Sequence, residues 1–223
     1  MLTDVIGDLL PAAAAVAVSP IPIVAIVLVL GSPQARTAGP AFALGWVAGL
    51  GVVSVTVTLV AGGAVESSSG VDTGISWGLA AIGLAFLVMA ARQWRKRPKP
   101  GEQPEMPAWM ATVGSVSWPR ALVLGLALSA ANPKNLALTL AASASIAQAG
   151  LETGEKLLAD AVFVAIGSIT VVGAVLFALV APRAATRPLD AVRRFMTDSN
   201  ATIMMVLLLV LGLKILGDAI GGP

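Results

Sequence analysis

The sequence predicts an all-α integral membrane protein with six transmembrane helices, of which helices 1 and 4 are broken. Three observations lead to this prediction. Hydrophobic residues make up 57% of the 223-residue chain and charged residues only 12%, about half of the roughly 25% that is usual in soluble domains. Several apolar segments are long enough to cross a bilayer. Two of these segments contain a proline motif near their middle.

A helix needs about 20 mostly apolar residues to span the hydrocarbon core. Six segments meet this requirement, at about 6–30, 39–62, 74–91, 119–147, 158–181 and 201–220. The second contains Gly45 and Gly49, a spacing of small residues that lets helix backbones approach closely; the abundance of glycine in this chain explains the pair equally well. We therefore divide the chain into a first three-helix repeat at 1–91, a cytoplasmic basic loop at 92–118 and a second three-helix repeat at 119–223.

The orientation follows from the basic residues, because cytoplasmic loops of membrane proteins carry an excess of Lys and Arg. The loops after the first, third and fifth segments, with the start of the fourth, hold eleven basic residues: Arg36, Arg92, Arg95, Lys96, Arg97, Lys99, Arg120, Arg183, Arg187, Arg193 and Arg194. The opposite side holds only Lys156. Both termini are therefore expected outside the cytoplasm of a cell (inner) membrane. The first ten residues contain two aspartates and no basic residue, unlike a signal peptide, so we expect the mature chain to begin at Met1.

Two segments contain a proline motif at similar depth. The first has Ser-Pro-Ile-Pro at 19–22 and the fourth has Asn-Pro-Lys-Asn at 132–135. Proline removes an intrahelical hydrogen bond, whereas Ser-Pro and Asn-Pro are good helix starts. Each long segment is therefore predicted to be two half-helices, broken about 18–20 Å into a core of roughly 30 Å. A kinked but continuous helix is the alternative at each break.

Three segments precede the fourth, so segments 1–3 and 4–6 would cross the membrane in opposite directions, as a 3+3 inverted repeat. Both second half-helices would begin near the midplane with their positive dipole ends. Lys134 adds a full charge there, while Asp160 and Asp218 fall toward the outer ends of their segments. An intramembrane lysine marks a functional site by default. We therefore predict that Lys134 attracts a negatively charged group.

Two alternatives remain for Lys134: it only hydrogen-bonds carbonyls freed at the breaks, or it carries protons. Lys214, in the outer half of the sixth segment, is expected to be structural. Hydroxyl residues within the segments are expected to bond to a neighbouring backbone or helix unless they line a cavity. These residues are Ser54, Thr56, Thr58, Thr139, Ser143, Ser168 and Thr170.

The six-helix pattern, the two proline motifs and the sequence AARQWRKRP at 90–98 resemble the GAP family. This family includes sulfolipid-1-addressing and glycopeptidolipid-addressing proteins and is grouped with the lysine-exporter superfamily. The resemblance covers essentially the whole chain. It implies a small transporter-like membrane protein for export or surface addressing of a polar or anionic (glyco/sulfo)lipid or similar solute. The substrate-binding residues that transfer by motif are Ser19, Pro20, Pro22, Asn132, Pro133, Lys134 and Asn135.

Other functions stay open or are disfavoured. An amino-acid exporter of the lysine-exporter type is one alternative, and an accessory or scaffold subunit of a larger lipid exporter, acting through the loop at 92–118, is another. No nucleophile–base pair or paired carboxylates indicate an enzyme. The chain lacks Cys and His, so we expect no disulfide, metal or cofactor. Expected partners are the bilayer, an anionic lipid or small-molecule substrate, a larger exporter and a second copy of the chain, with no nucleic acid.

Overall fold

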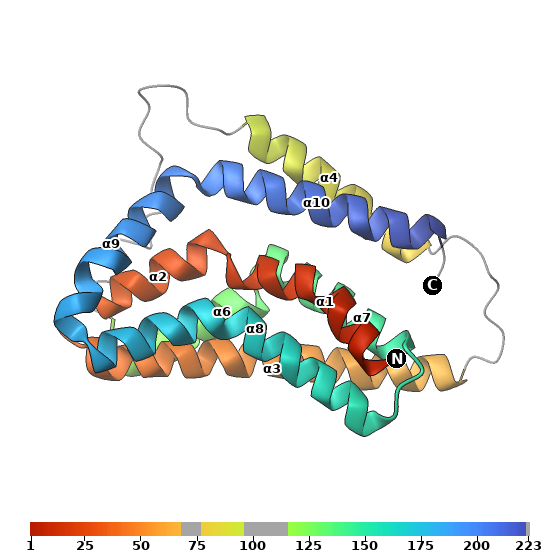
Figure 1. The fold of residues 1–223 in the computed structure, drawn as a ribbon, viewed down its shortest axis with the longest axis horizontal. Helices are drawn as coiled ribbons and strands as arrows, with labels where there is room; N and C mark the ends of the chain where they lie inside the picture. The colour runs from red at the N-terminus through yellow and green to blue at the C-terminus, as the bar shows by residue number, and fades with distance from the viewer. Residues whose placement is uncertain (68–76, 96–115, 222–223) are drawn as a thin grey trace.

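The computed structural model describes residues 1–67, 77–95 and 116–221. Within these ranges the chain is all-α and has no strand. Its helices are α1 (Leu2–Ala17), α2 (Pro20–Leu30), α3 (Ala35–Ser67), α4 (Trp77–Arg95), α6 (Trp118–Ala130), α7 (Pro133–Gln148), α8 (Thr153–Val180), α9 (Pro182–Asp198) and α10 (Asn200–Gly221). Figure 1 shows most of them running along the long axis of the molecule, with α4 and α10 packed side by side.

Several helices have the length and composition of membrane spans. Helices α3, α8 and α10 each qualify alone, and the bent pairs α1–α2 and α6–α7 each qualify as one broken span, which gives up to five among the described residues. Helix α4, which covers most of the predicted third span, is not among them, and residues 74–76 of that span lie outside the described residues. The prediction of a multi-pass membrane protein is therefore confirmed, while the sixth span stays a prediction.

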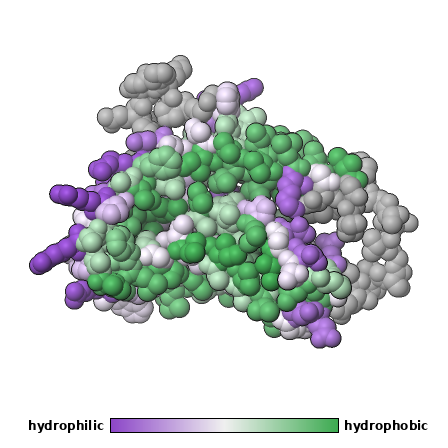
Figure 2. Space-filling model, viewed as in Figure 1, coloured by the Kyte–Doolittle hydropathy of each residue, from purple (hydrophilic) through white to green (hydrophobic). Residues whose placement is uncertain are grey.

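The outer surface agrees with this assignment. Large apolar side chains point away from the protein, and Val60 and Ile169 are 70% and 65% exposed. Figure 2 shows hydrophobic residues over the middle of one face and hydrophilic ones gathered toward its ends. Exposing such a broad apolar band to water would be costly. For this reason large contiguous apolar surfaces are rare on soluble monomers. Lipid is the environment that suits it.

Both predicted breaks are present. Helix α1 ends at Ala17 and α2 begins at Pro20, with a bend of 50° between them, and α6 and α7 are bent by 58° around Asn132. Ser19 and Asn132 have nearly the same extended backbone, with φ −70° at both and ψ of 114° and 118°. Each is followed by a proline at the start of the next helix. The continuous, merely kinked helix is therefore excluded at both positions.

The close approach that the spacing of Gly45 and Gly49 would permit occurs between α3 and α6. A Cβ atom at Gly45 would overlap the backbone oxygen of Leu122, and one at Gly125 would overlap that of Phe42. Helix backbones can meet this closely only where side chains are absent. The partner glycine on α6 was not predicted, because the small-residue spacing identifies one face of one helix and does not say what packs on it.

One segment differs from the prediction. The region around Arg183 and Arg194 was expected to be a loop, but it forms α9, which packs on α2, α8 and α10. Pro182 stands at the first position of the helix and Ala185 is buried, while most of the arginines face outward. This short amphipathic helix was not predicted, because it lacks the roughly 20 consecutive apolar residues that a span needs. Most of the predicted loop at 92–118 lies outside the described residues.

Candidate functional site

The two helix breaks are joined by side chains at the start of α7. The Lys134 ammonium donates hydrogen bonds to the Ala15 carbonyl at 2.7 Å and to the Ser19 hydroxyl at 2.8 Å. The Ser19 hydroxyl in turn donates to Asn135 Oδ1 at 2.8 Å. All three side chains are buried, and Lys134 is only 3% exposed. Three of the predicted site residues therefore meet in one cluster across a separation of more than a hundred positions along the chain.

The first break explains one contact of the lysine. In a continuous helix the Ala15 carbonyl would accept from the N–H of the residue four positions later. At the break, however, the Ser19 N–H bonds to the Val16 carbonyl at 3.2 Å. The Ala15 carbonyl is left without its helical partner, and a buried carbonyl without a hydrogen bond is costly. Lys134 satisfies it.

At the second break a freed carbonyl is likewise paired with a side chain. Asn135 Nδ2 donates to the Leu128 carbonyl at 3.0 Å, which lies five residues before Pro133, as Ala15 lies five before Pro20. The Asn132 side chain accepts from the backbone N–H of Lys134 at 3.1 Å and so caps α7. Both carbonyls are therefore paired with side chains of the first turn of α7.

The three predicted prolines shape the helix breaks and make no polar contact in the cluster. Pro20 and Pro133 stand at the first position of α2 and α7, and Pro22 is buried in the first turn of α2. Proline has no N–H and its side chain cannot form a hydrogen bond. These three predicted site residues shape the breaks, whereas Ser19, Asn132, Lys134 and Asn135 supply the polar contacts.

The cluster has an excess of positive charge. The N-terminal ends of α2 and α7 carry the positive ends of their helix dipoles. In the part of the chain that the structure describes, no carboxylate lies within ion-pair distance of the Lys134 ammonium, since the pairs found there are Met1–Asp4 and Arg193–Asp190. The partners of the amine are neutral oxygens. An anion would therefore complete the site.

A second buried polar cluster lies between α3, α7 and α8. The Asp160 carboxyl, 1% exposed, accepts at Oδ1 from the hydroxyls of Ser54 and of Thr58, the latter at 3.1 Å. The Ser143 hydroxyl donates to that of Ser54 at 3.2 Å. Sequence analysis placed Asp160 toward the outer end of its segment and gave it no role. The available signal was the i, i+4 spacing of Ser54 and Thr58, which puts both hydroxyls on one face of α3.

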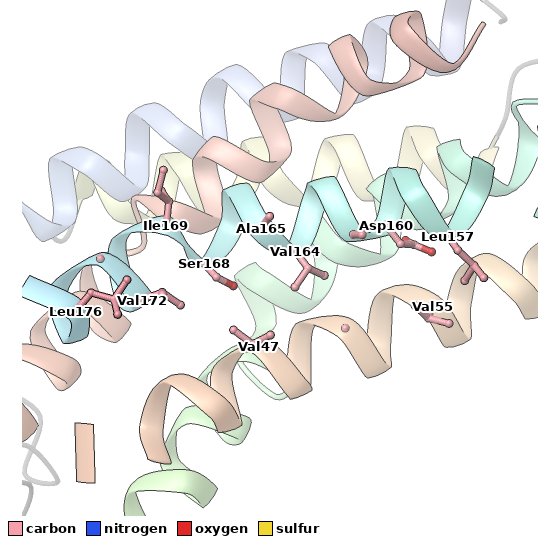
Figure 3. A pocket seen from close by; sticks show the side chains of 13 residues that line it. Val47, Val55, Leu157, Asp160, Val164, Ala165, Ser168, Ile169, Val172 and Leu176 are labelled. Carbon is pink, nitrogen blue, oxygen red and sulfur yellow. The ribbon is translucent and has the colours of Figure 1, made fainter. Parts of the chain in front are cut away.

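A groove of about 650 Å³ runs between α3 and α8, along the side of this cluster (Figure 3). Its walls are aliphatic residues and glycines, apart from Asp160 and Ser168. Asp160 Oδ2 and Ser168 Oγ are buried and have no hydrogen-bond partner among the described residues. The groove does not include Lys134. Lys134 is only 3% exposed, so its amine is closed off in this conformation.

A polar stripe on α7 connects the two clusters. Asn135, Thr139 and Ser143 follow one another at intervals of four residues and are all buried. Residues at this spacing lie on one face of a helix, and the stripe extends about 12 Å along its axis. Asn135 belongs to the lysine cluster and Ser143 to the Asp160 cluster. One helix face therefore joins the amine region to the carboxyl region.

These features define a helical, multi-pass membrane protein built around two broken spans that meet at a buried lysine. A family model described as Sap, sulfolipid-1-addressing protein, matches residues 9–221. The chain belongs to this family, as its two proline motifs suggested. No curated protein and no solved structure matches the chain. Membership links the protein to sulfolipid addressing at a membrane.

Proposed function

We propose that this protein is a transporter-like membrane protein that exports an anionic polar lipid, or addresses it to the cell surface, and that Lys134 binds the anionic group. The observation that supports this most directly is the environment of the lysine. Its ammonium is 3% exposed, lies between two helix breaks and contacts neutral oxygens. A sulfate or carboxylate headgroup is the chemistry that this environment lacks.

The energetics favour a bound anion over an empty site. Removing an ammonium from water costs several kcal/mol even after relaxation of the protein. Two hydrogen bonds to neutral oxygens offset part of that cost, at about 1.5–3 kcal/mol each for a charged donor. A sulfate or carboxylate would add an opposite charge in a region of low dielectric, where charge pairs interact strongly. Substrate binding and neutralisation of the amine would then be the same event.

The packing supports the 3+3 inverted repeat. Helix α3 packs on both halves of the second broken span, α6 and α7, and α8 packs on both halves of the first, α1 and α2. Helix α3 also packs on α8, and α4 packs on α10, and each of these contacts joins corresponding elements of the two halves. Reciprocal packing of this kind is expected when α4 serves as the third span and α10 as the sixth.

Alternating access follows from this arrangement. In secondary transporters with inverted repeats, one half rocks against the other around a midplane site. The lysine joins α7 to α1 through Ala15 and Ser19, so its contacts would break when the halves separate. The closed amine then corresponds to an occluded conformation, which opens when these helices move apart.

The distribution of charge supports an orientation in the cell membrane. The start of α3, the end of α4, the start of α6 and α9 lie at one end of the molecule, and both termini lie at the other (Figure 1). The described basic residues expected on the cytoplasmic side belong to the first of these ends: Arg36, Arg92, Arg95, Arg120 and the four arginines of α9. The positive-inside rule then places α9 in the cytoplasm and the termini outside.

The test is a comparison of surface lipids in a strain that lacks the gene. The strain is complemented with the wild type or with one of three variants: Lys134→Met, Lys134→Arg or Lys214→Met. Lys214→Met is the control for loss of a lysine on α10. Loss of the charge contact is worth about 1.5–3 kcal/mol, or roughly a tenfold to hundredfold loss of affinity. We expect Lys134→Met to lower extracted surface lipid, with Lys134→Arg less affected and Lys214→Met normal. Expression of each variant is measured in the same membranes.

The lipids and amino acids exported by these strains distinguish the anion site from the two alternative functions. Normal surface lipid in the Lys134→Met strain, at normal expression, would refute the anion site. Loss of exported amino acids with unchanged lipids would favour the amino-acid exporter. Sensitivity to changes in the loop at 92–118, but not at Lys134, would favour the accessory subunit of a larger exporter.

A further inference from the structure

The two oxygens of the Asp160 carboxyl have different surroundings. Oδ1 accepts hydrogen bonds from the hydroxyls of Ser54 and Thr58. Oδ2 is buried and has no hydrogen-bond partner within the described part of the chain. It belongs to a residue that lines the aliphatic groove between α3 and α8 (Figure 3). One oxygen of the carboxyl is therefore held by the protein, while the other has no hydrogen-bond partner among the described residues.

No described side chain forms an ion pair with this carboxyl. The described charged side chains on the helices packed around it are Asp4 and Asp8 on α1, Arg36 on α3, Lys134 on α7, and Glu155 and Lys156 on α8. Lys156 is the nearest in sequence, one turn earlier on α8, but none of the described ion pairs joins it to Asp160. Asp4, Asp8 and Glu155 are exposed, and Arg36 is about 27 Å from Ser54 along α3.

We propose that Asp160 is a proton-binding carboxyl, which takes up a proton at Oδ2 and releases it through the groove between α3 and α8. An ionised carboxylate without a partner is far more costly to bury than a neutral polar group. A proton on Oδ2 removes that charge and needs no further ligands. The hydroxyls of Ser54 and Thr58 hold the carboxyl in place in either state.

A metal cation fits this position less well. Sodium and other hard cations require several oxygen ligands. Beside Oδ2 the groove offers aliphatic side chains and glycines, and its other polar side chain, Ser168, lies two turns further along α8. The hydroxyls of Ser54 and Thr58 are already engaged at Oδ1. The proton is therefore the cation that this geometry accommodates.

The proton site goes beyond the anion site at Lys134 and does not depend on it. The polar stripe of Asn135, Thr139 and Ser143 nevertheless joins the two clusters along one face of α7. If both proposals hold, release of the proton from Asp160 and movement of the anionic substrate at Lys134 would be coupled through the same helix. A proton gradient would then be the energy source of the transporter.

The proton site can be tested without knowing the substrate. A hydrophobic carbodiimide reacts with a protonated carboxyl shielded from water and leaves a stable acylurea, which peptide mass spectrometry locates. The full-length protein, purified in detergent, is labelled with dicyclohexylcarbodiimide from about pH 5 to about pH 9. We expect labelling at Asp160 that falls by about tenfold per pH unit above its midpoint, as for a single titrating group.

Variants separate this site from other effects. Asp160→Asn removes the label at this position, while Asp8→Asn, at an exposed carboxyl of α1, leaves labelling of Asp160 unchanged. Ser54→Ala removes a donor that stabilises the carboxylate, so labelling at a fixed pH increases. Lys134→Met should leave the labelling of Asp160 unchanged, because the proton site does not depend on the anion site. The two proposals can therefore fail independently. Size-exclusion profiles confirm that each variant is folded.

Two results would overturn the proton site. The first is a wild-type Asp160 that stays unlabelled across the whole pH range in protein whose size-exclusion profile shows that it is folded. The second is protection by Na⁺ but not by choline at constant pH, which would make Asp160 a sodium ligand instead.

Discussion

Replacing Lys134 by methionine keeps a long side chain at this position and removes its charge. The variant separates two roles of the lysine, because an anion site and a structural link between the broken helices predict different effects on stability. If the lysine mainly holds the breaks together, its loss should weaken the fold. If it is kept for an anion, its loss should leave the empty protein about as stable as before.

The expected magnitude follows from the contacts. Lys134 donates to the Ala15 carbonyl and the Ser19 hydroxyl, and charged hydrogen bonds contribute about 1.5–3 kcal/mol each, so their loss costs about 3–6 kcal/mol. Against this, the variant no longer buries an ammonium that is 3% exposed, which relieves a penalty of several kcal/mol. We therefore expect the free energy of unfolding to change by less than about 2 kcal/mol.

The assay is thermal unfolding of the purified protein in detergent. For a chain of this size 1 kcal/mol corresponds to roughly 2–4 °C, so Tm should move by less than about 8 °C. A sulfated lipid at a hundred times its wild-type dissociation constant should stabilise the wild type by about 2.7 kcal/mol. With a tenfold to hundredfold lower affinity, Lys134→Met should gain only about 0.4–1.4 kcal/mol at the same lipid concentration. A zwitterionic lipid with the same acyl chains is the control for detergent exchange.

The reasoning would be refuted by a fall in Tm of more than about 12 °C in Lys134→Met, which matches uncompensated loss of the charged hydrogen bonds. Equal stabilisation of both proteins by the sulfated lipid would also refute it, because the lysine would then make no contribution to anion binding. Either result would assign Lys134 to the architecture of the breaks.

Two further predictions concern the fold. Gly125→Ala should lower the free energy of unfolding by about 1–3 kcal/mol, because its Cβ overlaps the Phe42 backbone. The control is Gly217→Ala, where no atom lies within 4 Å of the added Cβ, and it should be neutral or slightly stabilising. Equal effects of the two variants on thermal unfolding would contradict the close packing of α3 and α6. The chain contains no cysteine, so Thr3→Cys and Ala191→Cys each introduce one thiol. An impermeant maleimide should label Thr3→Cys in intact cells and Ala191→Cys only after permeabilisation, and the reverse pattern would invert the proposed orientation.

Local sequence features were sufficient to predict the breaks. Ser-Pro and Asn-Pro end one helix and start the next through the backbone of a few neighbouring residues. The same extended geometry at Ser19 and Asn132 confirms this reasoning. The spacing of Gly45 and Gly49 left a close helix contact open, and only the packing identified that contact and the partner glycine on α6. The amphipathic α9 was not predicted because its 17 residues are polar on one face and do not form an apolar segment of spanning length.

The amino-acid sequence by itself determined the class of protein and its broken helices, because hydropathy, proline geometry and the positions of basic residues act over short distances along the chain. Only the tertiary structure decided which groups meet. Lys134 and its Ala15 partner are 119 positions apart, and Asp160 and Ser54 are 106 apart. Such contacts depend on how helices rotate and pack against each other. A carboxyl that was expected near the end of its helix is therefore buried beside a groove.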